Sequence, residues 1–355
     1  MSGSTDSFQK RGLLMQDRTL PRRPGFTLVE LMTVIAIIVL LVGILIPALS
    51  SVRKQAKETA SAAVIKSLGD GCEMFHGEFG AYPQSRGYNP FEGESAAIPL
   101  TGAQWLTLQL SGPDSQGYVN PTVKNDTNGD DKIDENDWLE WYDLPANQSR
   151  TYTRSGPYAD PDGKQIRSVN RIIEENQDMA GIPALMVSNS AGGNGGSSVW
   201  NNQFLPFYVD QFEYPILYYA ATPGVKAPFT TGTPGGNFTI GKYDQSDDAA
   251  ITGSDGADGR YPVTGPGWDL TGAQPDPANF RHPLGTLGYV RDQDTWPNPN
   301  TFAAFVCDQN VFDNTVQPGG RGLLQPHNPD TFLLISAGSD GVYGTSDDIA
   351  NFEHN

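Results

Sequence analysis

Cysteine is scarce in this chain, which has two in 355 residues, Cys72 and Cys307. Two cysteines exclude a disulfide-dense scaffold and allow at most one bridge. A bridge between them is chemically allowed outside the cytoplasm, but the sequence does not show whether the two residues are close. Cys72 lies on an apolar stripe with helical spacing, which favours a small core residue over a reactive thiol.

Basic residues are also in short supply. The chain has 23 Lys and Arg against 41 Asp and Glu, for a formal net charge of −18. This balance argues against a nucleic-acid binder, which needs a basic face to displace counterions from phosphates. It also disfavours adsorption to anionic lipid, and it fits a soluble acidic domain or one that binds cations.

Several catalytic signatures are missing. The sequence has no His-Glu-x-x-His, no Gly-x-Ser-x-Gly, no Gly-x-x-x-x-Gly-Lys-Ser/Thr and no Cys-x-x-Cys. Its four histidines are scattered, and sequence alone does not bring them together: His76, His282, His327 and His354. With 40 Gly and 27 Pro, the chain is typical of a loop-rich, strand-bearing protein rather than a compact helical enzyme. We therefore nominate no catalytic residue and predict that the protein is not an enzyme.

One long apolar run stands out near the N-terminus. Residues 31–52 contain no charged side chain, and 22 helical residues at about 1.5 Å each span about 33 Å, enough to cross a bilayer. The 25 residues at the N-terminus carry five basic and two acidic side chains, a local charge of +3. The positive-inside rule keeps this flank in the cytoplasm and exports the remainder.

The start of this run differs from an ordinary secretory signal, whose apolar core is shorter. Gly25 precedes Phe26, and a lone acid, Glu30, stands within the apolar sequence. Placing a carboxylate at membrane depth costs about 2.5–3.5 kcal/mol on insertion scales, so a partner for Glu30 is expected. A simpler reading is a single-pass anchor with a glutamate at the interface.

Residues 25–30, Gly-Phe-Thr-Leu-Val-Glu, resemble the processing motif of type IV prepilins and of type II secretion pseudopilins. The resemblance implies that a prepilin peptidase cleaves between Gly25 and Phe26 and methylates Phe26. It also implies that Glu30 pairs with the Phe26 ammonium of a neighbouring subunit, which relieves the desolvation of both charges. Pro47 is similarly placed to a helix-softening proline of the family.

Past Pro47 the helical pattern continues without a breaker to about Phe79, with apolar residues at helical spacing, before residues 80–83 stop the helix. We predict an α+β, pilin-like fold: a long N-terminal helix on a small antiparallel sheet with long loop insertions. The expected parts are a leader peptide, a transmembrane or filament-core helix, the periplasmic half of the helix, and a loop-rich globular domain: 1–25, 26–52, 53–82 and 83–355.

Downstream apolar segments are short and bounded by turn residues. Residues 215–220 and 331–336 predict strands, whereas 182–187 and 301–306 fit either strands or short helices. Two Gly-rich stretches are interpreted as a flexible loop and a long irregular excursion, at 188–198 and 222–277 respectively. Residues 210–219 also resemble, in degraded form, the Asp-Pro-Trp-Gly-x-Pro strand start of major pseudopilins.

Residues 126–137 have the oxygen spacing of a 12-residue calcium loop. Side-chain oxygens fall at positions 1, 3, 5, 9 and 12, and a backbone carbonyl at 7, which calcium needs for its six to eight ligands. The loop resembles those of EF-hands and dockerins, but Asp131 replaces the turn glycine and position 12 is Asp rather than Glu. The alternative is a solvated acidic turn. The candidate calcium ligands are Asp126, Asn128, Asp130, Asp134 and Asp137.

A second acidic segment, 336–349, resembles the C-terminal calcium loop of major pseudopilins. By that match Asp340, Asp347 and Asp348 supply side-chain oxygens, with carbonyls near Ala337 and Tyr343 as further ligands. Clustered acids repel one another without a cation, so an ion would order the loop. The alternative is a mobile acidic tail. A third stretch, 255–259, lacks further ligands and favours a double turn.

These features together predict a structural subunit of a type II secretion pseudopilus. The resemblance implies other pseudopilins, the prepilin peptidase and an inner-membrane assembly platform with its ATPase as partners, with no nucleic acid. It places the chain in the bacterial inner membrane, N-terminus cytoplasmic and C-terminal domain periplasmic, before it assembles into a short periplasmic filament. The alternatives are a type IV pilin of a surface fibre and, in a different class, an anchored enzyme or glycan-binding module.

Overall fold

A computed structural model of the chain describes ten stretches of residues, together with Arg171: 25–91, 99–142, 152–159, 165–169, 205–231, 239–254, 267–271, 280–287, 301–308 and 324–353. The predictions for residues 182–187, 188–198 and 255–259, and for the leader before Gly25, lie outside these stretches. By its internal contacts the chain forms two units, Met1–Arg53 and Lys54–Asn355.

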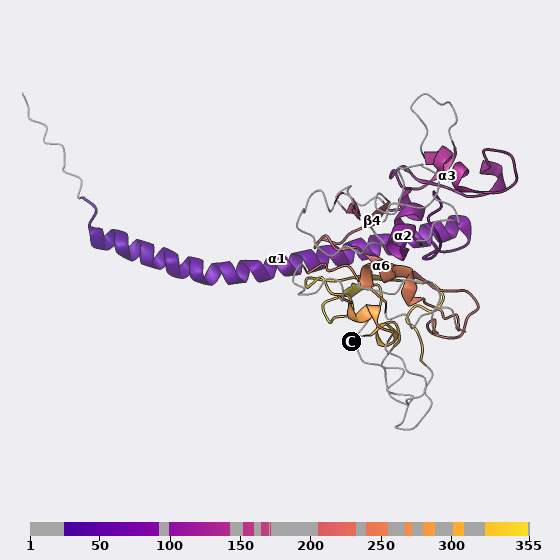
Figure 1. Cartoon of the computed structure of the whole chain (residues 1–355). Coiled ribbons are helices and arrows are strands. Elements are labelled where there is room, and N and C mark those ends of the chain that lie inside the picture. Colours follow the sequence, from indigo (N-terminus) through magenta and orange to yellow (C-terminus); the bar gives the residue numbers. More distant parts are fainter. Residues whose placement is uncertain are drawn as a thin grey trace, which may run out of the picture. The chain divides into compact units, whose positions relative to one another are not determined.

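The longest element is α1, a single helix of 52 residues from Leu28 to Phe79, drawn in indigo to purple in Figure 1. Pro47 lies inside it, where the Ser50 hydroxyl donates to the Pro47 carbonyl at 2.8 Å. The helix ends before Gly80, whose positive φ of 73° suits a glycine at a helix C-terminus. The prediction of one helix ending at about Phe79 is confirmed.

The centre of the second unit is a three-stranded antiparallel sheet in the order β5-β6-β7, comprising Leu217–Ala220, Phe332–Ser336 and Ile349–Ala350. Leu217 pairs with Ile335 and Ala220 with Phe332. The strands predicted at 215–220 and 331–336 are therefore confirmed.

Both faces of this sheet are buried. Alternate residues of a strand point to opposite faces, and here they enter two separate hydrophobic clusters. Tyr218 and Leu334 belong to the cluster that contains α1, whereas Tyr219 and Leu333 belong to the cluster formed with residues after 222. All four side chains are fully buried. The sheet is thus the middle layer of the unit.

The first layer combines the second half of α1 with the residues up to 208. It contains the fully buried helix α2 (Gly102–Ser111), the turn η1 (Val123–Asn125), helix α3 (Glu135–Tyr142) and two antiparallel pairs, β1-β2 and β3-β4. The strands of these pairs are Tyr118–Val119, Arg154–Ser155, Ile166–Ser168 and Pro206–Tyr208.

A capping box starts α2. The Thr101 side chain accepts a hydrogen bond from the Gln104 amide, and the Gln104 side chain accepts one from the Thr101 amide. Two N–H groups that the first turn leaves without helical partners are satisfied in this way.

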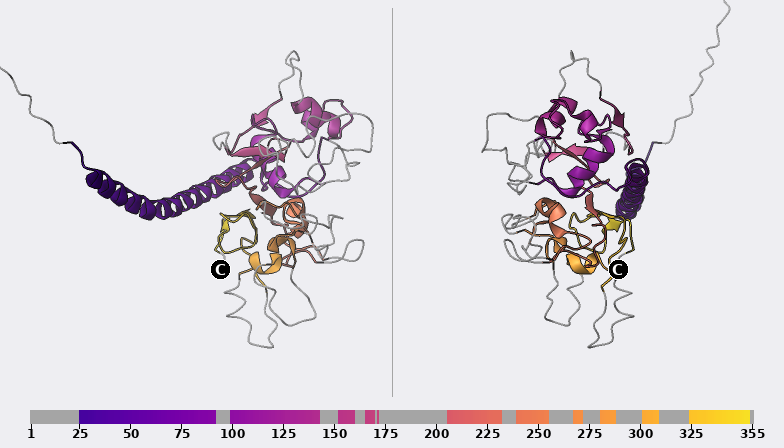
Figure 2. Two further views of the ribbon diagram at one scale, coloured as in Figure 1. Left: turned by 60° about the vertical axis from the view of Figure 1, so that its left-hand side comes forward. Right: turned by 90° about the vertical axis from the view of Figure 1, so that its right-hand side faces the viewer.

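The layer on the other face comes partly from the stretch 222–277, for which the sequence predicts an irregular excursion, and partly from residues after it. Its described parts contain η2 (Gln245–Asp248), α6 (Ala249–Thr252), η4 (Pro283–Gly285) and α7 (Phe302–Phe305). Tyr243, Ile251 and Trp268 are fully buried there. In both views of Figure 2, α2 and α3 gather on one side of this unit, and the orange and yellow segments on the other.

The long helix and the small antiparallel sheets confirm the α+β class and are consistent with a pilin-like fold. The segment 301–306, for which the sequence allowed a strand or a short helix, is the helix α7. Cys72 and Cys307 are both free and buried. They belong to the two different hydrophobic clusters, so each is a small core residue.

Candidate functional site

The first half of α1 is apolar on all sides and is not covered by any part of the chain that the structure describes. Every residue from Gly25 to Lys57 is exposed, including Leu28, Ile38 and Leu45. Among the described residues, α1 is the one helix long and apolar enough to cross a membrane. Exposed apolar surface of this extent indicates a lipid or protein partner, and α1 fits a single-pass membrane anchor.

Glu30 closes the N-terminus of α1. Its carboxylate accepts hydrogen bonds from the Thr27 amide at 2.9 Å and from the Thr27 hydroxyl at 2.8 Å. In return, the Glu30 amide donates to the Thr27 hydroxyl oxygen at 3.2 Å. This reciprocal pattern is a capping box. Sequence reasoning gave Glu30 a role toward a neighbouring subunit and missed this role within the chain, although Thr-x-x-Glu is the signal that identifies it.

The loop at 126–137 is folded around its own carboxylates. Asp126 accepts backbone N–H groups from Asn128, Gly129 and Asp131 at 2.7–3.0 Å. The Asn128 side chain accepts from the Asp130 amide, and the Asp130 side chain from the Lys132 amide, both at 2.9 Å. Each short polar side chain therefore turns the backbone that follows it, as Asx turns do.

Asp137 closes the same loop from the first turn of α3. One of its oxygens accepts from the Thr127 amide and hydroxyl, both at 2.7 Å, and the other from the Asp134 amide at 2.9 Å. Burial acts to raise the pKa of Asp137, but these hydrogen bonds outweigh it and lower the pKa. Asp131, in the place of the turn glycine, has a positive φ of 64°, a conformation that favours glycine.

The structure thus places four of the five predicted ligands before α3 and the fifth, Asp137, in its first turn. The donor set of carboxylate, amide and carbonyl oxygens suits a hard cation such as calcium. The indole of Trp141 donates to the carbonyl of Asn125, directly before the loop, at 2.9 Å. A tryptophan therefore lies in contact with the loop backbone.

In the C-terminal loop, three carboxylates gather around one hydroxyl. The Thr345 hydroxyl oxygen lies 3.1 Å from Asp340, 2.7 Å from Asp347 and 3.3 Å from Asp348 carboxylate oxygens. It also lies 3.2 Å from the Val342 carbonyl oxygen. A hydroxyl has one proton and donates to one acceptor at a time. The Thr345 hydroxyl therefore hydrogen-bonds to one of these oxygens at a time.

The three carboxyl groups of this loop influence one another's pKa. The pKa of Asp348 is raised to about 8, mainly by burial and also by the charges of Asp340 and Asp347, against hydrogen bonds from the backbone of Gly344 and Thr345 that lower it. Burial and the charge of Asp347 also raise the pKa of Asp340, although the Val342 amide and the Thr345 hydroxyl hydrogen-bond to it. Asp347 keeps a lowered pKa because bonds from Ser339 and Thr345 outweigh its burial.

The C-terminal loop has the carboxylate oxygens that hard cations prefer, but its side chains are not arranged as a set of metal ligands. Within the described stretches, no group of three or more His, Cys, Asp or Glu side chains is placed to hold a metal ion. Asp340, Asp347 and Asp348 nevertheless converge on Thr345, and the raised pKa of Asp340 and of Asp348 reflects the cost of gathering these carboxylates in one loop. These three residues, which the sequence predicted, are the ones that the fold brings together.

Tyr343 connects this loop to residues of two other segments. Its amide donates to His282 Nδ1 at 3.1 Å, its carbonyl accepts from the Leu284 amide at 3.3 Å, and its hydroxyl donates to the Pro215 carbonyl. Burial lowers the pKa of His282 to about 4, so the ring is neutral near pH 7 and Nδ1 can accept. No sequence pattern linked His282 to the loop.

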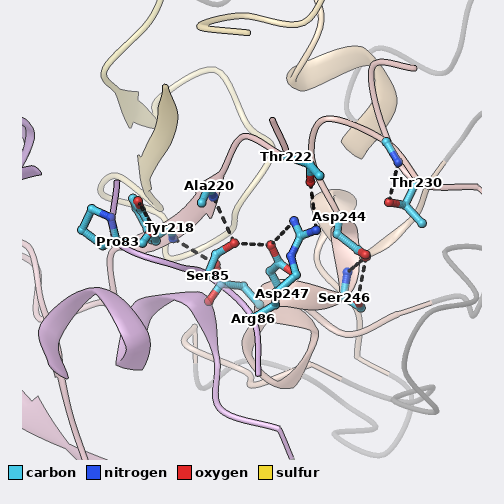
Figure 3. A network of polar contacts seen from close by, with 12 residues as sticks. Pro83, Ser85, Arg86, Tyr218, Ala220, Thr222, Thr230, Asp244, Ser246 and Asp247 are labelled. Carbon is cyan, nitrogen blue, oxygen red and sulfur yellow. Dashed lines mark hydrogen bonds and ion pairs between the residues drawn. The ribbon is translucent and has the colours of Figure 1, made fainter. Parts of the chain in front are cut away.

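A buried polar network beside β5 also escaped sequence reasoning (Figure 3). The Ser85 hydroxyl donates to Asp247 at 2.5 Å, and Ser85 accepts from the Ala220 amide at 3.0 Å. Arg86 bridges the Asp247 carboxylate and the Thr222 hydroxyl, both at 3.0 Å. Burial raises the pKa of Asp247 to about 7; Arg86 and Ser85 oppose this shift, while Asp244 adds to it.

The adjacent Asp248 ties α2 to the sheet. Its carboxylate accepts from the Ala103 amide at 3.0 Å and from the Tyr218 amide at 2.9 Å. A Cβ at Gly102 would lie 2.0 Å from the Tyr218 carbonyl oxygen, so only glycine fits there. Asp247 and Asp248 thus join α2, β5 and the segment after α1, which explains why they are buried.

Comparison with known proteins identifies one motif. Residues 20–46 match the family model of the prokaryotic N-terminal methylation motif. No curated protein matches the chain, and no solved structure does. The match covers the exposed start of α1, including Glu30, and it leaves the second unit unmatched. The N-terminal segment is therefore that of a type IV pilin-like protein, a pilin or a pseudopilin.

Proposed function

We propose that this chain is a subunit of a type II secretion pseudopilus, processed between Gly25 and Phe26 and assembled into a short periplasmic filament. The observation that carries the proposal is the methylation motif at residues 20–46 on a helix whose first half is apolar all round and exposed. Such a helix is stable in lipid before assembly and among its own copies afterwards. The motif indicates a structural subunit rather than an enzyme.

Assembly through Glu30 follows from its place at the start of α1. Its carboxylate lies within the first helical turn, close in sequence to Phe26, the residue that processing would make N-terminal. In a filament of packed apolar helices, a neighbour's Phe26 ammonium would supply the countercharge that this acid needs. The hydrogen bonds from Thr27 hold the carboxylate at the helix end and orient it for that pairing.

Two substitutions separate pairing from capping. Glu30→Gln keeps a side-chain oxygen that can accept from Thr27 but removes the charge, whereas Thr27→Ala removes the hydroxyl of the capping box but keeps the charge. We expect Glu30→Gln to be processed normally and to be lost from sheared or cross-linked filaments, and Thr27→Ala to be retained. Incorporation of Glu30→Gln at the wild-type level would refute the charge pairing.

The pseudopilin is preferred over a surface pilin because an acidic loop, 336–349, follows the last long strand, as in the major pseudopilins that it resembles. Deletion of the gene should then block secretion of the exported proteins and leave no surface fibres. Surface fibres that disappear on deletion, with secretion intact, would assign the chain to a type IV pilus instead. The periplasmic placement of the second unit is part of the same proposal.

Calcium is proposed to bind both acidic loops. Asp340, Asp347 and Asp348 would hold it in 336–349, and Asp126, Asn128, Asp130, Asp134 and Asp137 in 126–137. When bound, the ion supplies the positive charge that offsets the repulsion among the carboxylates. The convergence on Thr345 and the closed loop before α3 support these two assignments.

Melting curves in calcium chloride and in chelator test the C-terminal loop. The double variant Asp347→Ala with Asp348→Ala should lower the melting temperature in calcium and have little effect in chelator. An equal effect in both buffers would count against ligation. For the loop at 126–137, calcium should change the fluorescence of Trp141, which hydrogen-bonds to Asn125. The variant Asp126→Ala should remove that change.

A further inference from the structure

An exposed acid occupies a left-handed position in the turn that joins β4 to β5. Glu213 has a φ of 73°, a conformation that favours glycine and is costly for a residue with a long side chain. The degraded motif that residues 210–219 resemble has glycine at this position. Strain that is kept at an exposed residue points to a role for its side chain.

Hydrogen bonds on both sides of Glu213 hold this conformation. The Asp210 amide donates to the Tyr214 carbonyl at 2.9 Å, and the Glu213 amide donates to the Asp210 carbonyl at 3.2 Å. The buried Asp210 carboxylate accepts from the amides of Phe212 at 2.7 Å and Tyr214 at 3.0 Å. None of these bonds uses the Glu213 side chain, so a glycine there would keep them all.

The turn lies against α1 at the start of the second unit. The Gln211 amide donates to the Ser61 hydroxyl oxygen at 3.1 Å, and Ser61 is fully buried. The Lys57 ammonium lies over the Phe212 ring, 5.2 Å from its centroid, an arrangement that attracts the cation to the ring face. Glu213 directly follows Phe212, so it belongs to the part of the turn that lies beside α1.

The same stretch of α1 carries exposed cations. Arg53, Lys54 and Lys57 are all exposed, and no acid lies between them in the sequence. Lys54 is 3.7 Å from Glu58, and a surface pair of this length contributes little. Within the stretches that the structure describes, the Glu213 carboxylate forms no ion pair. Each copy of the chain therefore offers both an exposed acid and a group of exposed cations.

We infer that Glu213 of one copy pairs with the basic segment 53–57 of the next copy in the filament. The inference rests on the proposed function. Pairing of Glu30 with a neighbour's Phe26 offsets parallel copies of α1 by about four residues, or about 6 Å along the axis. Residues 57–61 of one copy, which the turn contacts, then stand level with 53–57 of the next.

Charge explains why the acid is retained at this place. With that offset, the cations of one copy would lie beside Lys57 of the adjacent copy, and like charges repel. Glu213 supplies a negative charge between the two groups. The contact is heterologous, because each copy gives its acid to one neighbour and its cations to the other, so it can repeat along a filament.

Competition for the filament tests the charge. A tagged variant is expressed with the untagged wild type, and the ratio of the two chains in isolated filaments is compared with their ratio in the membrane. Tagged wild type sets the reference. Glu213→Gln keeps the strained turn but removes the charge, and it should be depleted from filaments about two- to fivefold. Incorporation of Glu213→Gln at the reference ratio would overturn the pairing.

Glu213→Gly separates assembly from folding. It should be depleted from filaments by the same factor as Glu213→Gln. In urea unfolding of the full chain in detergent, it should raise the folding equilibrium constant of the second unit about threefold, because relief of the left-handed residue outweighs the added chain entropy of glycine. A side chain with a purely structural role would not improve folding and weaken assembly together on removal. A less stable Glu213→Gly would contradict the strain that motivates the inference.

Two matched controls cover the two properties of Glu213. Ser115→Gly relieves another exposed left-handed residue, whose φ is 60°; it should be stabilised similarly and enter filaments at the reference ratio. Glu135→Gln removes an exposed acid from α3 and should also enter at the reference ratio. Depletion of either control to the level of Glu213→Gln would show that the effect is not specific to Glu213, and would overturn the pairing.

Cross-linking between copies locates the contact. One chain carries Glu213→Cys and a co-expressed chain carries Lys54→Cys, so a mixed dimer formed by a short bismaleimide can arise only between copies. The two native cysteines are buried. Met74→Cys, at an exposed position about 30 Å further along α1, replaces Lys54→Cys as the control and should give no mixed dimer.

The outcomes distinguish this inference from the function on which it rests. Equal cross-linking of Glu213→Cys to Met74→Cys and to Lys54→Cys, in filaments that form normally, would overturn the pairing and leave the proposed function intact. If tagged wild type enters no filament, the proposed function is wrong and the pairing falls with it.

Discussion

The two halves of α1 share one helix and have opposite surroundings. From Leu28 to Arg53 every side chain is exposed, whereas from Ser61 onward buried residues recur every three or four positions: Ser61, Val64, Ile65, Leu68, Gly71, Cys72 and Phe75. The first half is apolar all round and packs against none of the other described residues. The second half is apolar along one stripe and packs against the sheet and α2.

This difference determines what kind of partner can cover the apolar surface of each half. A stripe can be covered by the chain's own core, so the second half belongs to a folded unit. An apolar surface on all sides can be covered only by lipid or by other helices. Secondary structure is therefore the same in both halves, and the distribution of side chains around the axis decides which half assembles.

The largest effect is expected when one leucine is replaced by alanine in each half of α1 and the stability of the second unit is compared. Leu68 is 1% exposed and packs in the first layer, so Leu68→Ala should destabilise the second unit by about 2–5 kcal/mol. Leu41→Ala, in the exposed half, should leave that unfolding unchanged. Urea unfolding followed by tryptophan fluorescence measures both. An equal loss for the two variants would mean that the first half also packs on a core.

A charge placed in each half tests the membrane role. Ile38→Lys puts a cation in the apolar half and should cost about 2.5–3.5 kcal/mol of insertion, seen as a smaller membrane fraction. Ala62→Lys places the same charge on the exposed side of the packed half and should leave the membrane fraction unchanged. Equal fractionation of the two variants would break the distinction between the halves.

The stability of the second unit as a function of pH tests the buried acids that connect its elements. Burial raises the pKa of Asp247 from 3.8 to about 7. Because the folded pKa is above the unfolded one, this group's contribution is fully present below about pH 4 and is lost as pH rises toward 7. From these two pKa values, the expected loss is about 4 kcal/mol. In Asp247→Asn, the part of the pH dependence between 4 and 7 that comes from this group should disappear; an unchanged slope would contradict the assignment.

The smallest effect is expected when the capping threonine of α1 or of α2 is removed. Thr101→Ala removes the buried cap of α2 and should cost the second unit about 1 kcal/mol. Thr27→Ala removes the exposed cap of α1 and should leave unfolding of that unit unchanged. Chemical denaturation of both variants decides the matter, and a measurable loss in Thr27→Ala would show that the two units unfold together.

Much of this organisation was accessible from sequence because its signals are local. The helix to Phe79 follows from spacing and the absence of breakers, and the strands at 215–220 and 331–336 from apolar runs between turn residues. The loop at 126–137 was predicted from ligand spacing and the loop at 336–349 from its resemblance to major pseudopilins, and calcium in both stays a prediction. Glu30 was found as a lone acid, and its capping bond with Thr27 was also readable as Thr-x-x-Glu.

The rest depends on contacts between residues far apart in the chain. Asp247 meets Ser85 across 162 positions, and Tyr343 meets His282 across 61. The layer built by η2, α6 and α7 consists of elements of four residues, too short to show a helical period. In 222–277, which contains η2 and α6, a composition rich in Gly, Pro and Asp favoured an irregular interpretation, while single buried residues such as Trp268 form the core.

The account depends on the polymer-forming half of α1 beginning at a newly made amine. Intact-mass and N-terminal peptide analysis of the protein from native membranes measures this directly. We expect a chain that starts at N-methylated Phe26. A protein that retains the residues before Gly25, or that begins at any other position, would contradict the proposed processing and, with it, the pairing of Phe26 with Glu30.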